Sequence, residues 1–194
     1  EKVLSYIDVL KHKKPVGKRV AVIGAGGIGF DVSEYLTHEG VVTSQNIDAW
    51  LKEWGIDKTF KSRAGIENVQ PAFKASSRTI FMFKRSKGKF GGNLGKTTGW
   101  IHRSTLKKKQ VQFIAEVAYT KIDDQGLHYT QNEEAKILEV DNIIICAGQT
   151  SYKELYQPLL DAGKKVHVIG GAHFAGEIDA KRAINQGARL AAKL

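Results

Sequence analysis

Residues 18–31 read KRVAVIGAGGIGFD, and this stretch decides the fold. The apolar run Val20–Ile23 predicts a β-strand and residues 30–36 predict a helix, so the glycines between them join a strand to a helix. Their G-x-G-x-x-G spacing allows a tight turn, close approach of the backbone to a pyrophosphate and close packing of the helix, whose N-terminal amides face the anion. This order favours a dinucleotide site over the alternative of a glycine-rich structural turn. The candidate binding residues of the loop are Gly24, Ala25, Gly26, Gly27, Ile28 and Gly29.

The composition is that of a globular protein. The chain has 194 residues, of which 42% are hydrophobic, enough for one substantial domain or for one domain plus a fragment. Its longest apolar runs fall far short of the roughly 20 residues that a membrane-spanning helix needs, and its first residues do not lead into the apolar run of a signal peptide. The single cysteine, Cys146, excludes an internal disulfide and a cysteine-ligated metal or iron–sulfur site built from this chain alone. We therefore expect a cytoplasmic protein with no membrane partner.

The formal net charge of +10 indicates an acidic partner. The candidates are phosphate-bearing cofactors, acidic protein surfaces and nucleic acid. The basic residues fall into separate short clusters, which are typical of solvated loops and helix ends. A nucleic-acid-binding module would show interleaved aromatic and basic residues on one surface and has only the charge in its support, so we expect no nucleic-acid partner.

The rest of the chain predicts an α/β fold with a parallel sheet. The fold is that of a Rossmann-like dinucleotide-binding domain that contains one long insertion. The second strand, at residues 78–83, comes late, so residues 38–77 are interpreted as an insertion. Within it, a short helix that carries Trp50 and Trp54 and ends at Gly55 is expected to pack onto the domain. Residues 116–140 predict a small antiparallel meander, and residues 141–148 return as a buried parallel strand. Further helices are expected over residues 3–10, 100–106, 152–162 and 178–193, and further strands over 111–114 and 166–169.

The end of the second strand indicates which dinucleotide the glycine loop holds. An acidic residue there usually binds the free 2′-hydroxyl of an adenosine ribose, whereas a 2′-phosphate calls for arginine or lysine. This chain has Lys84, Arg85 and Ser86 at that place, which favours NADPH over NADH. Two alternatives remain: the cations are ordinary surface residues at a strand end, or the loop holds FAD, which predicts a carboxylate in their place.

No residue of the chain is assigned as a catalytic acid, base or nucleophile. His102 and Arg103 follow a glycine-rich loop and could approach a cofactor phosphate, but a pair of this kind on a helix surface is more often structural. Thr97 and Thr98 stand near a helix start, where threonine hydroxyls more often cap the helix. The sequence contains no H-E-x-x-H and no G-x-S-x-G motif, so hydrolytic and metal-dependent chemistry has no support.

Three segments, in this order, resemble the bacterial NADPH-dependent 2,4-dienoyl-CoA reductases. They are the glycine loop with Phe30 and Asp31, the sequence LGKTTGWIHR at residues 94–103, and DNIIICAGQ at residues 141–149. VHVIGG at residues 166–171 and DAKRAI at residues 179–184 follow. The resemblance covers essentially the whole chain, and GKTTGWIHR is far more specific than the glycine spacing.

The resemblance implies a modular flavoenzyme with an N-terminal barrel that carries FMN, an iron–sulfur cluster, and a C-terminal pair of domains that bind FAD and NADPH. In this family NADPH reduces FAD, and electrons pass through the cluster to FMN, which acts on a dienoyl thioester in the β-oxidation of unsaturated fatty acids. Residues 1–16 would be a fragment of the FAD domain or a linker helix, residues 17–149 the NADPH-binding domain, and residues 150–194 the closing segment of the FAD domain. FMN and the cluster belong to the part outside this chain, whose flavin barrel is the expected partner.

By position, the resemblance assigns Gly24, Gly26 and Gly29 to the pyrophosphate of NADPH, and Lys84, Arg85 and Ser86 to its 2′-phosphate. Ala147, Gly148 and Gln149 would lie near the nicotinamide and the junction with FAD. Gly170 and Gly171 stand where related flavoproteins have a Gly-Asp pair whose carboxylate holds the FAD ribityl chain. That aspartate is absent, and Glu177 and Asp179 are the candidates to replace it.

Because basic residues follow the second strand, the chain alone is expected to bind NADPH ahead of NADH. Because its FAD site would be partial, it is not expected to reduce a dienoyl-CoA. An alternative function is a regulatory or interaction domain that binds FAD or NAD without redox turnover. A flavin barrel and clustered cysteines encoded upstream of residue 1 would distinguish the reductase from this alternative.

Overall fold

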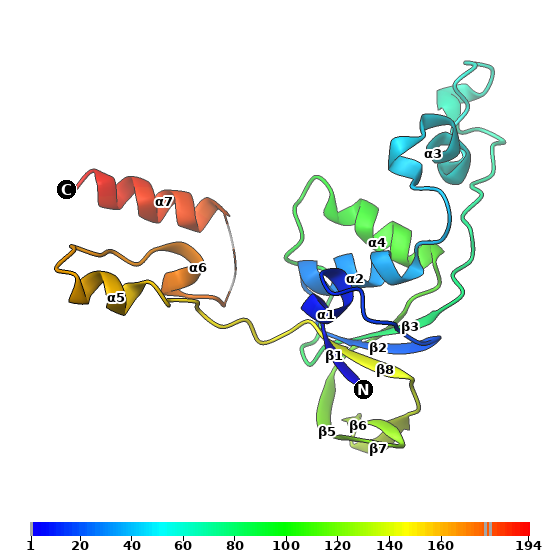
Figure 1. Ribbon diagram of the computed structural model, residues 1–194. Helices are drawn as coiled ribbons and strands as arrows, with labels where there is room; N and C mark the ends of the chain where they lie inside the picture. The colour runs from blue at the N-terminus through cyan, green and yellow to red at the C-terminus, as the bar shows by residue number, and fades with distance from the viewer. Residues whose placement is uncertain (1, 177, 179) are drawn as a thin grey trace. The chain divides into compact units, whose positions relative to one another are not determined.

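A five-stranded parallel sheet forms the centre of the first part of the chain (Figure 1). The structure is a computed structural model that describes residues 2–176, 178 and 180–194. The chain divides into two compact units, and the first, which contains this sheet, ends at Ala147. The strand order is β1-β8-β2-β3-β4. In register, Ile23 pairs with Phe83 on one side and with Ile145 on the other, so the central strands end at one level. The residues that follow them therefore meet at one edge of the sheet. The strands are β1 Val3–Ser5, β2 Arg19–Ile23, β3 Thr79–Phe83, β4 Gln112–Ile114 and β8 Asn142–Ile145.

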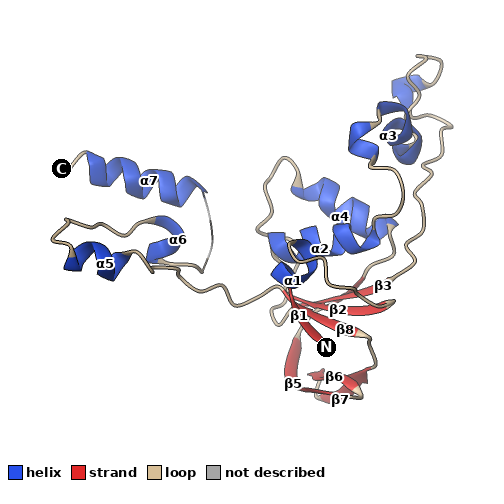
Figure 2. Cartoon of the chain, viewed as in Figure 1, coloured by secondary structure: helices blue, strands red, loops and turns tan. Residues whose placement is uncertain are grey.

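Helices and a second sheet cover the two faces of the parallel sheet (Figures 1 and 2). Helices α1 (Tyr6–Leu10), α2 (Gly27–Thr37) and α4 (Gly99–Lys108) lie on one face. The antiparallel strands β5, β6 and β7 lie on the other, in that order, and confirm the predicted meander. The α/β fold class predicted from the sequence is thus confirmed. The bounds are Val117–Asp123 for β5, Gly126–Gln131 for β6 and Glu134–Leu138 for β7.

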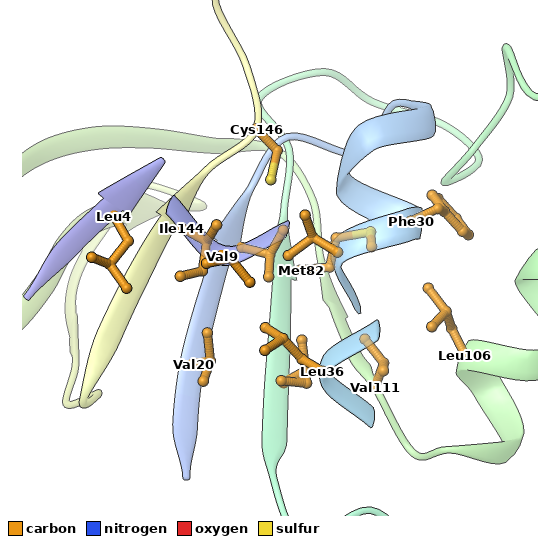
Figure 3. Close-up of a cluster of buried hydrophobic side chains, with 13 residues drawn as sticks. Leu4, Val9, Val20, Phe30, Leu36, Met82, Leu106, Val111, Ile144 and Cys146 are labelled. Carbon is orange, nitrogen blue, oxygen red and sulfur yellow. The ribbon is translucent and has the colours of Figure 1, made fainter. Parts of the chain in front are cut away.

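Each face of the parallel sheet has its own hydrophobic core. Val20 and Val22 of β2 point to the helix side, and Ala21 between them points to the meander side. Burial on both faces explains why these strands are unbroken apolar runs. Figure 3 shows the helix-side core around Leu4, Val9, Val20, Phe30, Leu36, Met82, Leu106, Val111, Ile144 and Cys146. The meander-side core contains Ala21, Phe81, Phe83, Val117, Leu127, Tyr129, Val140 and Ile143.

The start of the chain differs from the prediction of one helix over residues 3–10. Val3–Ser5 is strand β1, paired in parallel with β8, and only Tyr6–Leu10 is helical. The Ser5 hydroxyl accepts a hydrogen bond from the Asp8 amide at 3.1 Å, and the Asp8 carboxylate accepts one from the Ser5 amide at 2.9 Å. This capping box fixes the helix start at Tyr6. β1 and α1 lie in the same compact unit as the glycine loop.

The segment 38–77 forms short elements joined by irregular chain. Helix α3 (Ile47–Trp54) ends at Gly55, whose φ of 69° is left-handed, as the sequence predicts. None of its residues is buried, and Trp54 packs on Trp50 and on Phe73 of the same segment. The helix meets the domain through Glu53, whose carboxylate lies 3.8 Å from the Lys109 ammonium. Lys109 connects the segment to α4, because its Nζ donates to the Lys74 carbonyl at 2.8 Å. The 3₁₀ turns are η1 (Thr43–Gln45) and η2 (Arg63–Gly65).

The second unit, from Gly148 onward, contains three helices among its described residues: α5 (Tyr156–Asp161), α6 (Gly170–His173) and α7 (Ala180–Ala191). The final helix is confirmed, and the helix expected over 152–162 is shorter. Residues 166–169 form no strand, because no described strand of this unit lies beside them. Gly170 donates its amide hydrogen to the Gln186 side chain at 2.6 Å, which ties α6 to α7. The unit begins two residues before the expected boundary at 149/150.

No helix in the described part of the chain is long and apolar enough to cross a membrane. Glu177 and Asp179, the candidates for a flavin contact, lie outside the described residues.

Candidate functional site

A pocket of about 560 Å³ opens at the edge of the sheet where the central strands end. Ile23 and Gly24 come from the end of β2, and Ala147 comes from the segment after β8. Lys84, Arg85 and Ser86 follow β3 directly. The structure therefore brings the start of the glycine loop and the predicted cationic segment to one pocket. The lining residues are Ile23, Gly24, Lys84, Arg85, Ser86, Tyr119 and Ala147.

Two glycines of the loop are required by the fold. Gly24 has a φ of 120°, and a Cβ there would lie 2.9 Å from the Cys146 carbonyl carbon and oxygen. A Cβ on Gly29 would lie 1.9 Å from the Gly24 carbonyl oxygen, which is shorter than any contact distance that two such atoms can adopt. Gly24 thus makes the turn possible, and Gly29 lets α2 pack on the strand that precedes it.

The two middle glycines face open space. A Cβ on Gly26 or on Gly27 would meet no described atom within 4 Å. The neighbouring Ala25 and Ile28 are half-buried and pack against the helix-side core, so their side chains face the protein. A ligand can therefore approach the loop backbone at Gly26 and Gly27, which is the arrangement that pyrophosphate binding requires.

The beginning of α2 presents its positive end with no acidic residue in its own first turn. Gly26 is the N-cap residue and supplies no side-chain hydrogen bond, and the first turn holds no acidic residue. The first amides of a helix have no intrahelical acceptor, and the helix dipole favours negative charge there. Together with the space beside Gly26, this end of α2 suits a phosphate.

The three residues after β3 are held in different ways. The Lys84 backbone amide donates to the Ile114 carbonyl at 3.0 Å, and its Nζ donates to the carbonyls of Lys89 and Lys87 at 3.1 and 3.3 Å. Its ammonium also lies 4.9 Å from the centre of the Phe90 ring. The Lys84 side chain thus holds the following loop. Arg85 and Ser86 are exposed, and among described residues none forms a hydrogen bond or ion pair with the Arg85 guanidinium.

Tyr119 is a pocket residue that the sequence analysis did not identify. It lies on β5, and its half-buried ring packs edge-on against Phe83 with the ring centres 6.4 Å apart. Burial raises the pKa of its phenol to about 12, against the opposing effect of the nearby Arg85 charge. The spacing of Val117 and Tyr119 signals that both point toward the same side of the strand, but it does not reveal which side faces the ligand.

His102 and Arg103 have structural roles outside the pocket lining. The Nδ1 atom of His102 lies 2.7 Å from the Glu34 carboxylate, which joins α4 to α2. Burial raises the pKa of Glu34, and its hydrogen bond with His102 acts in the opposite direction. Arg103 donates to the Gly91 carbonyl at 3.0 Å and so holds the glycine-rich loop against α4.

The predicted residues at the junction are divided between the units. Ala147 lines the pocket, and the preceding Cys146 donates its amide hydrogen to Ile23 at 2.8 Å. Gly148 and Gln149 belong to the second unit. Gly170 and Gly171 open α6 there, and Gly170 has a left-handed φ of 59° close to Ala183 of α7. Their assignment to the nicotinamide and to FAD stays a prediction.

The sequence matches the family model of the pyridine nucleotide-disulphide oxidoreductases over residues 4–173. The chain belongs to this family. Its members combine flavin and nicotinamide dinucleotide binding, so the family and the geometry of the glycine loop point to the same class of ligand. The chain therefore contains the dinucleotide-binding domain of this oxidoreductase family.

Two curated proteins that resemble this chain are much longer than it is. It is 24% identical over 171 residues to a metal reductase of Desulforamulus reducens, covering 88% of this chain and 24% of that protein. It is 23% identical over 173 residues to a cinnamate reductase of Clostridium sporogenes, covering 89% of this chain and 21% of that protein. The chain thus spans about a quarter of the length of these curated relatives or less.

Two solved structures share the fold. A 2-naphthoyl-CoA reductase in complex with 2-naphthoyl-CoA has a TM-score of 0.64 at 18% identity, over 95% of this chain and 22% of that one. Histamine dehydrogenase from Rhizobium sp. 4-9 has a TM-score of 0.64 at 16% identity, over all of this chain and 26% of that one. At these identities the likeness shows the fold, which agrees with the family match.

Proposed function

We propose that this chain is the NADPH-binding part of a larger flavin-dependent reductase and that it positions NADPH for hydride transfer to FAD. The observation that carries the proposal is the composition of the pocket wall. It combines the start of the glycine loop with Lys84, Arg85 and Ser86, and no acidic residue is among its described lining residues. A wall of this kind suits a 2′-phosphate better than a free ribose hydroxyl.

The residues present fit a nicotinamide dinucleotide. The first amides of α2 would hold the pyrophosphate, because the space beside Gly26 and Gly27 is open. Arg85, with no described ion-pair partner, would neutralise the 2′-phosphate, and Ser86 would donate a hydrogen bond to it. The bound nucleotide supplies the hydride. The chain contributes orientation, and none of its residues is assigned a proton-transfer role.

We propose further that the parent enzyme is a 2,4-dienoyl-CoA reductase that acts in the cytoplasm in the β-oxidation of unsaturated fatty acids. The support is the segment LGKTTGWIHR at residues 94–103, together with the order of the other resembling segments. In this proposal the second unit, with Gly170 and Gly171, completes an FAD domain. FMN, the iron–sulfur cluster and the flavin barrel belong to the remainder of the parent protein.

The preference for NADPH over NADH is tested by titration calorimetry of the 194-residue chain with each nucleotide. We expect NADPH to bind at least about tenfold more tightly, because each charge-assisted hydrogen bond contributes roughly 1.5–3 kcal/mol. Arg85→Ala should remove most of this preference, whereas Lys107→Ala, which removes an equal charge from an exposed site on α4, should preserve it. Equal affinities of the unsubstituted chain for the two nucleotides would contradict the NADPH assignment.

The substrate is tested separately with the complete parent protein. Oxidation of NADPH should depend on added 2,4-dienoyl-CoA, and the 194-residue chain alone should show none. A parent protein that oxidises NADPH with another electron acceptor but leaves dienoyl-CoA unchanged would refute the substrate while leaving the nucleotide assignment standing.

A further inference from the structure

Tyr119 is the one described pocket residue that comes from the antiparallel sheet. The other lining residues belong to β2 and to the segments that follow β2, β3 and β8. The three-stranded sheet therefore has a part in the pocket wall, in addition to covering one face of the parallel sheet.

The position of Tyr119 is fixed by its surroundings. It stands opposite Tyr129 of β6, and both rings pack edge-on against Phe83, with ring centres 6.4 and 5.1 Å from that of Phe83. The pairing of β5 with β6 shifts between Tyr119 and Lys121, which is the irregularity of a β-bulge. A bulge changes the direction of nearby side chains and is frequent beside binding sites. Tyr119 is half-buried there, whereas Tyr129 is 7% exposed and buried in the core.

Tyr119 lines the pocket and is half-buried. No hydrogen bond to its hydroxyl is formed by any residue in the described part of the chain. A tyrosine phenol keeps its proton at neutral pH, and burial raises its pKa further, from 10 to about 12, so it can donate a hydrogen bond. Arg85 lines the same pocket as Tyr119, and its positive charge acts to lower the pKa of this phenol.

We propose that the Tyr119 hydroxyl donates a hydrogen bond to the same 2′-phosphate that Arg85 neutralises, so that the antiparallel sheet contributes to the choice of NADPH over NADH. This inference rests on the proposed NADPH site and adds a specificity residue to it. The arrangement supplies a neutral donor beside a charged one. Both donors act on a group that NADH lacks, so each raises the affinity for NADPH without raising the affinity for NADH.

The test uses calorimetry of the 194-residue chain with adenosine 2′,5′-bisphosphate and with 5′-AMP, which differ only in the 2′-phosphate. Tyr119→Phe keeps the ring against Phe83 and removes the hydroxyl. We expect it to weaken binding of the bisphosphate about tenfold and to leave 5′-AMP binding unchanged, because only a hydrogen bond to a charged group is lost. Tyr129→Phe, which removes the hydroxyl from the opposite ring outside the pocket lining, is the matched control and should change neither affinity.

The outcomes separate this inference from the proposed function. If the unsubstituted chain binds the two probes equally, the NADPH assignment fails and the role of Tyr119 fails with it. If the chain prefers the bisphosphate and Tyr119→Phe retains that preference in full, only the role of the hydroxyl is refuted. Equal weakening of both probes by Tyr119→Phe would also refute it, because the hydroxyl would then act on the adenosine 5′-phosphate that the two probes share.

Discussion

The same substitution at two glycines of the loop should have opposite consequences. In Gly26→Ala the new Cβ enters space that holds no described atom within 4 Å, and the φ of −87° at this position is open to alanine. Alanine is a poorer N-cap than glycine but has less freedom in the unfolded chain, so the free energy of unfolding should change by less than about 1 kcal/mol. The methyl group would stand where the pyrophosphate must approach. Loss of one or two hydrogen bonds to a charged group corresponds to a roughly tenfold to hundredfold weaker affinity for NADPH.

In Gly29→Ala the Cβ would lie 1.9 Å from the carbonyl oxygen of Gly24 and 2.9 Å from its carbonyl carbon. Both atoms are backbone, so the contact cannot be relieved by a change of rotamer. The helix must move away from the strand, at a cost of about 2–3 kcal/mol, near the upper end for overpacked cores. For a unit of this size, the melting temperature should fall by about 4–12 °C.

The assay pairs thermal unfolding, followed by circular dichroism, with NADPH titration of both variants. Gly26→Ala should melt with the unsubstituted chain and bind NADPH weakly, whereas Gly29→Ala should melt early. Undiminished affinity of Gly26→Ala for NADPH would show that the open space at the loop is not the pyrophosphate site. A normal melting temperature of Gly29→Ala would show that the fold does not require glycine there.

Two further predictions concern the pocket and its neighbours. Lys84→Ala should weaken NADPH binding less than Arg85→Ala in the same titration. The reason is that the Lys84 ammonium already donates to two carbonyls of the following loop. An equal or larger loss of affinity in Lys84→Ala would make Lys84 the principal phosphate ligand. Burial raises the pKa of the Cys146 thiol to about 12. Alkylation of the folded chain by iodoacetamide at pH 8 should therefore be about a thousandfold slower than that of a small free thiol, and its rate should rise about tenfold per pH unit. Rapid labelling of Cys146 in the folded chain at pH 8 would contradict this.

The core of the fold was predictable because its strands are buried on both faces. Residues 20–23 and 143–146 are apolar without interruption, which is the pattern of a parallel sheet covered on both sides. The structure at the start of the chain was not predictable, because the apolar spacing over residues 3–10 suits one continuous helix and a short strand followed by a helix equally well. The Ser5-x-x-Asp8 capping box was the signal that separates them. Residues 166–169 have strand composition, but a strand forms only beside another strand, and the described part of the second unit provides none.

The candidate site was predictable where it depends on strand ends and not where it depends on side-chain direction. Lys84 and Arg85 could be placed in the pocket because residues that follow neighbouring parallel strands meet at one edge. Tyr119 comes from a separate sheet, whose alternation defines two faces without showing which one meets the nucleotide. The shift of pairing after Tyr119, which is specified by contacts between β5 and β6, has no signature in the local sequence.

The long segment between α2 and β3 does not disturb the site, and the reason lies at the opposite edge of the sheet. α2 returns from the pocket, so the segment 38–77 leaves and re-enters at the edge where the strands begin. Arg78 fixes that edge, because its guanidinium donates to the carbonyls of Gly17 at 3.1 Å and Leu36 at 3.2 Å, just before β2 and near the end of α2. The register of β2 with β3 is thereby set before the strands reach the pocket, and the entropy of closing a loop grows only slowly with its length. The segment 38–77 therefore joins the domain at the edge of the sheet opposite to the one where Gly24 and Arg85 follow their strands.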